Sequence, residues 1–146
     1  MPDGADAIPS GTVLAFDFGL KRIGVAIGEM MLGQARPLAT IAQEANDARF
    51  AAIGRLIEEW QPATLIVGLP LTVDGEEHEM SARCRRFAHQ LEGRYRLPVR
   101  LVDERFSSVT AEERLAGRGL DWRQRKQAVD AEAATVILQD WFDHAH

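Results

Sequence analysis

Three carboxylates occupy positions in the sequence where a charged group is costly. Asp17 lies within the apolar segment LAFDF, and Glu104 stands at the end of another apolar segment. Asp130 lies four residues before Ala134, on the apolar face of a predicted C-terminal helix. A buried carboxylate without a partner is destabilised or stays protonated. The three together predict a shared divalent cation.

The chemistry of such a site follows from its ligands. Carboxylate oxygens suit Mg²⁺ or Mn²⁺, and these ions keep room for water and for substrate phosphate. One or two such ions can activate an attacking water and stabilise the leaving oxygen of a phosphodiester. The carboxylates then bind metal rather than act as acids. We therefore expect a metal-dependent nuclease with catalytic and metal-binding residues Asp17, Glu104 and Asp130.

Each carboxylate also has a simpler explanation when it is considered alone. Asp130 could pair with an arginine, and Asp17 could form a turn before Gly19. Glu104 could belong to a surface set of ion pairs with its charged neighbours. These explanations stay open for each residue, but they account less well for all three.

The apolar pattern predicts strands and helices that could position these residues. Alternation predicts a β-hairpin and a weaker third strand, and two continuous apolar runs predict strands of a parallel sheet. The predicted strands cover residues 13–18, 22–27, 37–41, 64–67 and 99–102. Helical spacing predicts one helix that ends before Pro62, a second through Met80 and Leu91, and a third that starts near Asp121. A right-handed strand–helix–strand crossover places Glu104 beside the end of strand 64–67.

Length and composition favour one α/β domain. We expect residues 1–11 to form a flexible tail and residues 12–146 to form a single domain. Cys84 lies on the apolar face of the second predicted helix, which predicts a buried thiol rather than a catalytic one. The sequence shows neither a secretory segment nor an apolar run of membrane-spanning length, so we expect a cytoplasmic protein.

The charge distribution limits how the chain could bind nucleic acid. A net charge of −5 argues against binding by bulk positive charge. The cationic side chains are nearly all arginines, whose planar fork suits phosphate. They gather in two clusters, which could also be solvated surfaces: Arg83, Arg85 and Arg86, and then Arg118, Arg123, Arg125 and Lys126. His78 and His89 are expected at the surface, without a catalytic role.

Four segments carry a resemblance to a known family. They are LAFDFGLKRIGVAIGE, LIVGLPLTVDGEE, VDERFSS and VDAEAATVILQDWF, in that order. Together they resemble the YqgF/RuvX family, whose members are named as pre-16S rRNA nucleases or Holliday junction resolvases. The resemblance extends from about Thr12 to Asp143, and the acidic positions of the family fall on the same three carboxylates.

The resemblance implies an RNase H-like α/β fold, with a mixed five-stranded sheet flanked by helices. Such a sheet combines an antiparallel hairpin with parallel strands. It also implies metal-dependent phosphodiester cleavage that matures the 5′ end of 16S ribosomal RNA, with precursor RNA or ribosomal precursor particles as partners. By their positions, Lys21, Arg22 and Arg105 are expected to contact nucleic-acid phosphate, although they could simply be solvated.

Other functions remain as alternatives. The first is resolution of four-way DNA junctions, for which a dimer would be expected, although the sequence shows no dimer face. The second is a ribosome-assembly factor that binds RNA without cutting it. The hairpin around Asp17 also resembles the phosphate-binding hairpin of actin-like ATPases and sugar kinases, but those folds need a second such hairpin and a longer chain.

Overall fold

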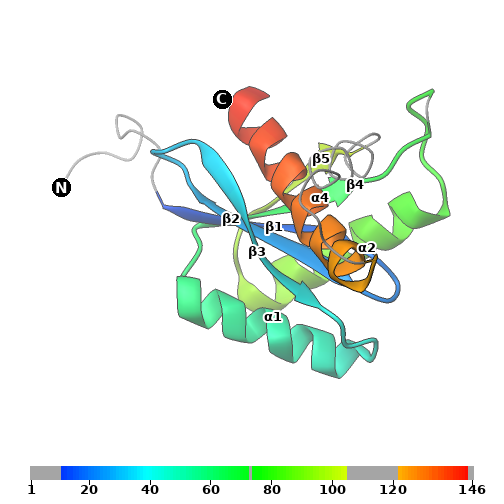
Figure 1. Cartoon of the computed structure of the whole chain (residues 1–146), viewed down its shortest axis with the longest axis horizontal. Coiled ribbons are helices and arrows are strands. Elements are labelled where there is room, and N and C mark those ends of the chain that lie inside the picture. The colour runs from blue at the N-terminus through cyan, green and yellow to red at the C-terminus, as the bar shows by residue number, and fades with distance from the viewer. Residues whose placement is uncertain (1–10, 73, 105–121, 145–146) are drawn as a thin grey trace.

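A mixed β-sheet forms the centre of the molecule (Figure 1). The computed structural model describes residues 11–72, 74–104 and 122–144, with side chains described from Val129 onward in the last of these stretches. The strands are β1 (Thr12–Phe18), β2 (Ile23–Glu29), β3 (Gln34–Ile41), β4 (Thr64–Leu69) and β5 (Val99–Asp103). The helices are α1 (Asn46–Trp60), α2 (Glu79–Tyr95) and α4 (Trp122–His144).

The order of strands in the sheet confirms the predicted fold class. From one edge to the other the order is β3, β2, β1, β4, β5. Strand β2 pairs antiparallel with both β1 and β3, whereas β4 pairs parallel with both β1 and β5. The carboxyl ends of the three parallel strands therefore lie at the same end of the sheet, where ligands bind in open α/β sheets.

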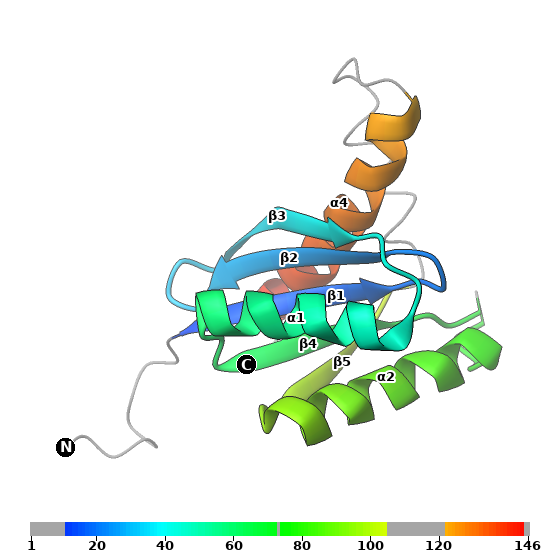
Figure 2. The same ribbon diagram turned by 90° about the horizontal axis from the view of Figure 1, so that it is seen from below.

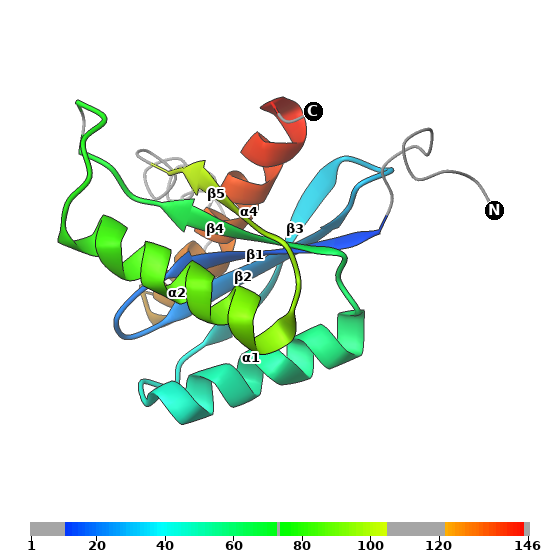
Figure 3. The ribbon, with the colours of Figure 1, turned by 180° about the vertical axis from the view of Figure 1, so that it is seen from behind.

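Helices cover both faces of the sheet (Figure 2). Alternate residues of β1 point to opposite faces, so Leu14 and Phe16 pack with α1 and α2, whereas Val13 and Ala15 pack with α4. Figure 3, seen from behind, shows α1 and α2 on the near side of the sheet and α4 beyond it. The site residues must therefore come from both layers.

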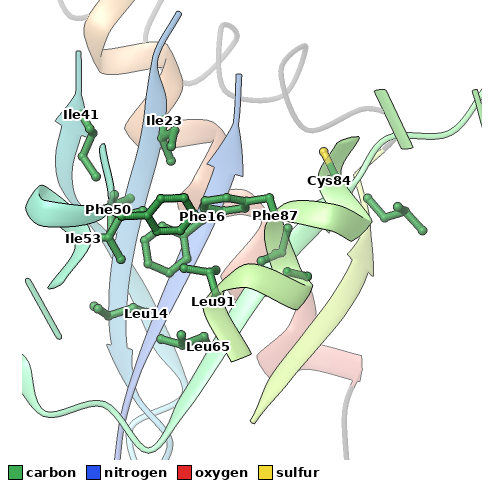
Figure 4. Close-up of a cluster of buried hydrophobic side chains, with 14 of the residues drawn as sticks. Leu14, Phe16, Ile23, Ile41, Phe50, Ile53, Leu65, Cys84, Phe87 and Leu91 are labelled. Atoms are coloured by element: carbon green, nitrogen blue, oxygen red, sulfur yellow. The ribbon is translucent and has the colours of Figure 1, made fainter. Parts of the chain in front are cut away.

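The core under α1 and α2 is the larger of the two (Figure 4). Its centre is aromatic. The rings of Phe16 and Phe87 pack edge to face with their centroids 5.9 Å apart, and the centroid of the Phe50 ring lies 6.0 Å from that of Phe87. Cys84 belongs to this cluster and is fully buried, which confirms the prediction of a core thiol. The core holds the carboxyl ends of β1 and β4 rigidly against α2.

The helix boundaries follow recognisable local signals. Helix α1 ends at Gln61, which adopts a left-handed conformation before Pro62. Helix α2 begins after His78, whose ring accepts a hydrogen bond from Met80 N, while the Ser81 hydroxyl accepts one from the backbone of His78. His78 is exposed, as expected, but it caps this helix rather than lying within it. The predicted start of the last helix, Asp121, lies outside the described residues.

Strand β3 is longer than predicted because a bulge accommodates its proline. Pro37 pairs with Ala26, and Ala39 pairs with Val25, so one extra residue lies on β3 at this point. Proline cannot donate to the ladder, but β3 is an edge strand and tolerates it. In the described part of the chain, no helix has the length and apolar character needed to cross a membrane.

Candidate active site

The three predicted carboxylates come from three different elements that meet at the carboxyl end of the sheet. Asp17 is the next-to-last residue of β1, Glu104 directly follows β5, and Asp130 lies on α4. The backbone N–H of Glu104 donates to the carbonyl oxygen of Leu69 at 3.1 Å, which places Glu104 beside the end of β4. This position confirms the one expected from the strand–helix–strand crossover.

Asp17 and Glu104 share a hydrogen bond between their side chains. Two carboxyl groups can do this only when one of them holds a proton. Burial is the main cause that raises the pKa of Asp17, from 3.8 to about 6, and the negative charge of Asp130 adds to this effect. The hydrogen bond to Glu104 acts in the opposite direction and lowers it. The site therefore disfavours negative charge on Asp17 unless a positive charge arrives.

Asp130 has a cationic partner of its own. Its carboxylate accepts a hydrogen bond from the Nε of Arg22 at 2.5 Å, and the side chains of Arg22 and Asp130 are 26% and 19% exposed. The simplest explanation of Asp130, an ion pair with arginine, is thus part of this structure. Arg22 was expected to contact phosphate, and in this arrangement the same guanidinium holds an acid of the predicted metal site.

Two glycines allow the acidic residues to approach the sheet. A Cβ at Gly24 of β2 would lie 1.8 Å from the backbone oxygen of Asp130, so only glycine permits this packing of α4. A Cβ at Gly68 of β4 would lie 2.8 Å from Oε2 of Glu104. Sequence reasoning missed both glycines. Their signal was glycine in the interior of an otherwise apolar strand.

The three acids meet the chemical requirements of a metal site but not its geometry in this structure. Among the described residues, no group of three or more His, Cys, Asp or Glu side chains is arranged to hold a metal ion. The chemistry of the acids nevertheless fits a hard cation, because all three offer oxygen and Asp17 is destabilised when charged. Release of Asp130 from Arg22 and loss of the shared proton would free these carboxylates for a cation.

The remaining predicted residues have separate positions. Lys21 is exposed on the turn between β1 and β2, beside Arg22. Arg105 lies outside the described residues. Cys84 is not a nucleophile here, because burial raises the pKa of its thiol to about 12, and the negative charges of Glu104 and Asp17 add to this effect.

Solved structures share the fold of this chain. The RuvC of Thermus thermophilus in complex with a Holliday junction substrate is 17% identical, with a TM-score of 0.54, over 90% of this chain and 92% of that chain. The Fowlpox virus resolvase in complex with Holliday junction DNA is 9% identical, with a TM-score of 0.54, over 90% and 97% of the two chains. The fold is that of the RuvC-like, RNase H-type resolvases.

Sequence comparison then defines the family. The RuvX family model, described as Holliday junction resolvase, matches residues 11–144. A relative from Methylobacillus flagellatus, named "Putative pre-16S rRNA nuclease", is 57% identical over 143 residues, 98% of this chain and 97% of its own. A relative of the same name from Chromobacterium violaceum is 58% identical over 131 residues, 89% of this chain and 96% of its own. This chain belongs to the RuvX family of nucleases.

Proposed function

We propose that this nuclease depends on a divalent cation, Mg²⁺ or Mn²⁺, and acts at the 5′ end of precursor 16S ribosomal RNA. The observation that supports the metal site is the partly buried Asp17, which shares a hydrogen bond with Glu104 and lies within the field of the negative charge of Asp130. The RNA substrate is supported by the names of relatives that are 57% and 58% identical over nearly the whole chain.

In this proposal Asp17, Glu104 and Asp130 hold one or two cations. A bound cation supplies a Lewis acid for a phosphate oxygen and lowers the pKa of a water molecule that attacks phosphorus. Desolvation raises the pKa of Asp17, so a cation beside this carboxylate would compensate a charge that its surroundings disfavour. Gly68 lets Glu104 lie against β4, and Gly24 lets Asp130 approach β2.

The cationic residues next to the acids position the substrate in this proposal. Arg22 pairs with Asp130 in this structure, and its guanidinium would be available to a phosphate oxygen beside the cut if Asp130 instead held a cation. Lys21 and Arg105 supply further contacts to the backbone of the nucleic acid. Contacts of this kind fix the register of the substrate but do not read its sequence.

The test compares two substrates and two proteins. A 5′-leader fragment of precursor 16S RNA and a four-way DNA junction are incubated with Mn²⁺, Mg²⁺ or EDTA, using wild type and Asp17→Asn. Metal-dependent cleavage of the RNA that is lost in the variant is the expected result. Absence of cleavage of either substrate by folded protein would contradict the proposal and favour a factor that binds RNA or ribosomal precursor particles without cutting them.

Four-way junction resolution is the second candidate, favoured by the description of the family model that matches residues 11–144. Cleavage confined to the junction, with paired symmetric cuts, would establish it over the RNA substrate. Symmetric cutting requires two sites related by a two-fold axis, so the same result would also require a dimer in solution.

A further inference from the structure

A cationic site lies on the face of the sheet opposite to the acids. It is a cavity of about 160 Å³ between the start of α1 and the middle of α2, several times the roughly 30 Å³ that a water molecule occupies in the liquid. Arginine, amide and phenylalanine side chains form its wall: Phe18, Asn46, Arg49, Phe50, Arg83, Arg86, Phe87 and Gln90. None of these lining residues is acidic.

Arg49 is the buried cation of this cavity. The residue is only 4% exposed, and burial lowers the pKa of its guanidinium. It donates to the backbone oxygens of Gln43 at 2.7 Å and of Gly19 at 2.6 Å, and it forms no ion pair with a described residue. Glu44 contributes its negative charge from a greater distance. These two neutral carbonyl groups do not neutralise the positive charge of Arg49, so an anion in the cavity would be stabilised.

Two exposed arginines complete the site from α2. Among the described residues, Arg86 forms neither a hydrogen bond nor an ion pair. Arg83 pairs with Glu79 at 2.9 Å, but both side chains are well exposed, at 48% and 79%. An exposed pair of this kind contributes about 0.2–1 kcal/mol, so a phosphate can displace Glu79 at little cost. The first turn of α1 adds backbone N–H groups, because its N-cap residue Ala45 makes no side-chain cap.

The cavity and the acids share the carboxyl end of β1. Asp17 and Phe18 are consecutive residues of that strand, so their side chains point to opposite faces of the sheet. Arg49 also holds the carbonyl of Gly19, in the turn that carries Lys21 and Arg22. A nucleic-acid strand that passes round this end of the sheet could reach both sites.

We infer that this cavity binds a backbone phosphate of the nucleic-acid substrate, away from the phosphate that is cut. The inference rests on the proposed function only for the nature of the ligand. It assigns a role to the first arginine cluster: Arg83 and Arg86 line the cavity, whereas Arg85 is engaged with Glu77 at 2.7 Å.

The test measures binding of a short single-stranded RNA in EDTA, where cleavage plays no part. Arg86→Gln is compared with Arg55→Gln, which removes one exposed helical arginine outside the cavity. We expect Arg86→Gln to weaken binding about three- to tenfold and to reduce the salt slope of log Kd by about 0.7, the share of one phosphate contact on a single strand. Both variants should keep the Tm of the wild type.

Two outcomes would overturn the inference. Equal RNA affinities for Arg86→Gln and Arg55→Gln would mean that the cavity does not contact the nucleic acid. Inorganic phosphate is the second probe, measured by its effect on Tm. If phosphate stabilises the wild type and not Arg86→Gln while RNA affinity is unchanged, the cavity is a site for a small phosphate instead. Loss of metal-dependent cleavage in all proteins, with the expected binding difference, would contradict the proposed function and leave this inference standing.

Discussion

At the level of single residues, the raised pKa of Asp17 makes the stability of the protein depend on pH. A carboxyl group whose pKa is higher in the folded state is stabilising when protonated, and this contribution is lost as the pH rises through the folded value. For Asp17 the window runs from about 3.8 to about 6. At neutral pH and without metal, the folded protein therefore carries an unfavourable charge. A difference of this size corresponds to about 3 kcal/mol.

Asp17→Asn should therefore stabilise the metal-free protein at pH 7 by up to about 3 kcal/mol, because the amide is neutral and can form a hydrogen bond with Glu104. The gain should shrink as the pH falls through about 6 and should vanish below about 3.8, where the wild-type carboxyl is protonated in both states. Urea denaturation in EDTA across this range measures it. Asp74→Asn, in an exposed loop, is the control and should show no such trend. A variant that is less stable than wild type at pH 7 would contradict the assigned burial of the charge.

Gly68 makes a second prediction at this level. In Gly68→Ala the new methyl group would lie 2.5 Å from Cδ1 of Ile137 and 2.8 Å from Oε2 of Glu104. We expect overpacking to lower the free energy of unfolding by about 1–3 kcal/mol, measured by denaturation. We also expect weaker Mn²⁺ binding, measured by calorimetry. Gly93→Ala is the matched control, because a Cβ there meets nothing within 4 Å. The control should gain about 0.5–1 kcal/mol from helix propensity. Unchanged Mn²⁺ affinity in Gly68→Ala would mean that Glu104 does not need this position.

At the level of elements, the approach of α4 to β2 determines where Asp130 lies. Gly24→Ala would place a methyl group 1.8 Å from the backbone oxygen of Asp130, so the helix must move away from the strand. We expect the free energy of unfolding to fall by about 3 kcal/mol or more. We also expect Mn²⁺ binding to be lost. Gly28→Ala is the control on the same strand, where the clashes involve the Phe142 ring and the backbone oxygen of Gln34. It should also reduce stability but keep Mn²⁺ affinity, and equal losses of affinity in both variants would exclude a specific role for Gly24.

The elements themselves were largely predictable because their apolar periods are strong. Both strands of the hairpin were expected within two residues of their observed bounds, and the end of α1 before Pro62 was correct. Strand β3 was predicted to begin at Pro37, but it begins at Gln34, because the bulge that accommodates the proline depends on pairing with β2. Such pairing is a tertiary property that local pattern does not contain.

That the three acids lie close together was predictable, but their contacts were not. Asp17 and Asp130 could be recognised because carboxylates on apolar faces are rare. The ion pair between Arg22 and Asp130 joins residues 108 positions apart, and neither spacing nor composition specifies it. Arg49 was not recognised as part of a cationic cavity, because a single arginine in a helix gives no sign of its burial.

At the level of the whole molecule, a net charge of −5 opposes the approach of a polyanion. The acids at the carboxyl end of the sheet add to this repulsion at the proposed substrate site. A bound divalent cation would reverse the local sign. We therefore expect RNA to bind about tenfold more weakly in EDTA than in Ca²⁺ at equal ionic strength, measured by fluorescence anisotropy.

The same measurement on Asp17→Asn provides the control for this effect. With one acid neutralised, binding in EDTA should improve and the response to Ca²⁺ should be smaller. An equal response to Ca²⁺ in both proteins would show that the ion acts on the RNA alone rather than at the acidic site.

The buried thiol of Cys84 allows the opening of the core to be followed by chemical labelling. Cys84 is the sole cysteine of the chain, and it is completely buried in the core between α2 and the sheet. A thiol reagent can reach it only when that packing opens, so the rate of labelling reports how often this layer separates. If Asp17 and Glu104 bind Mn²⁺, the ion should slow the labelling in wild type and leave the rate unchanged in Asp17→Asn. The rate of Cys84 labelling thus reports whether metal binding at the sheet stabilises the packing of α2 against it.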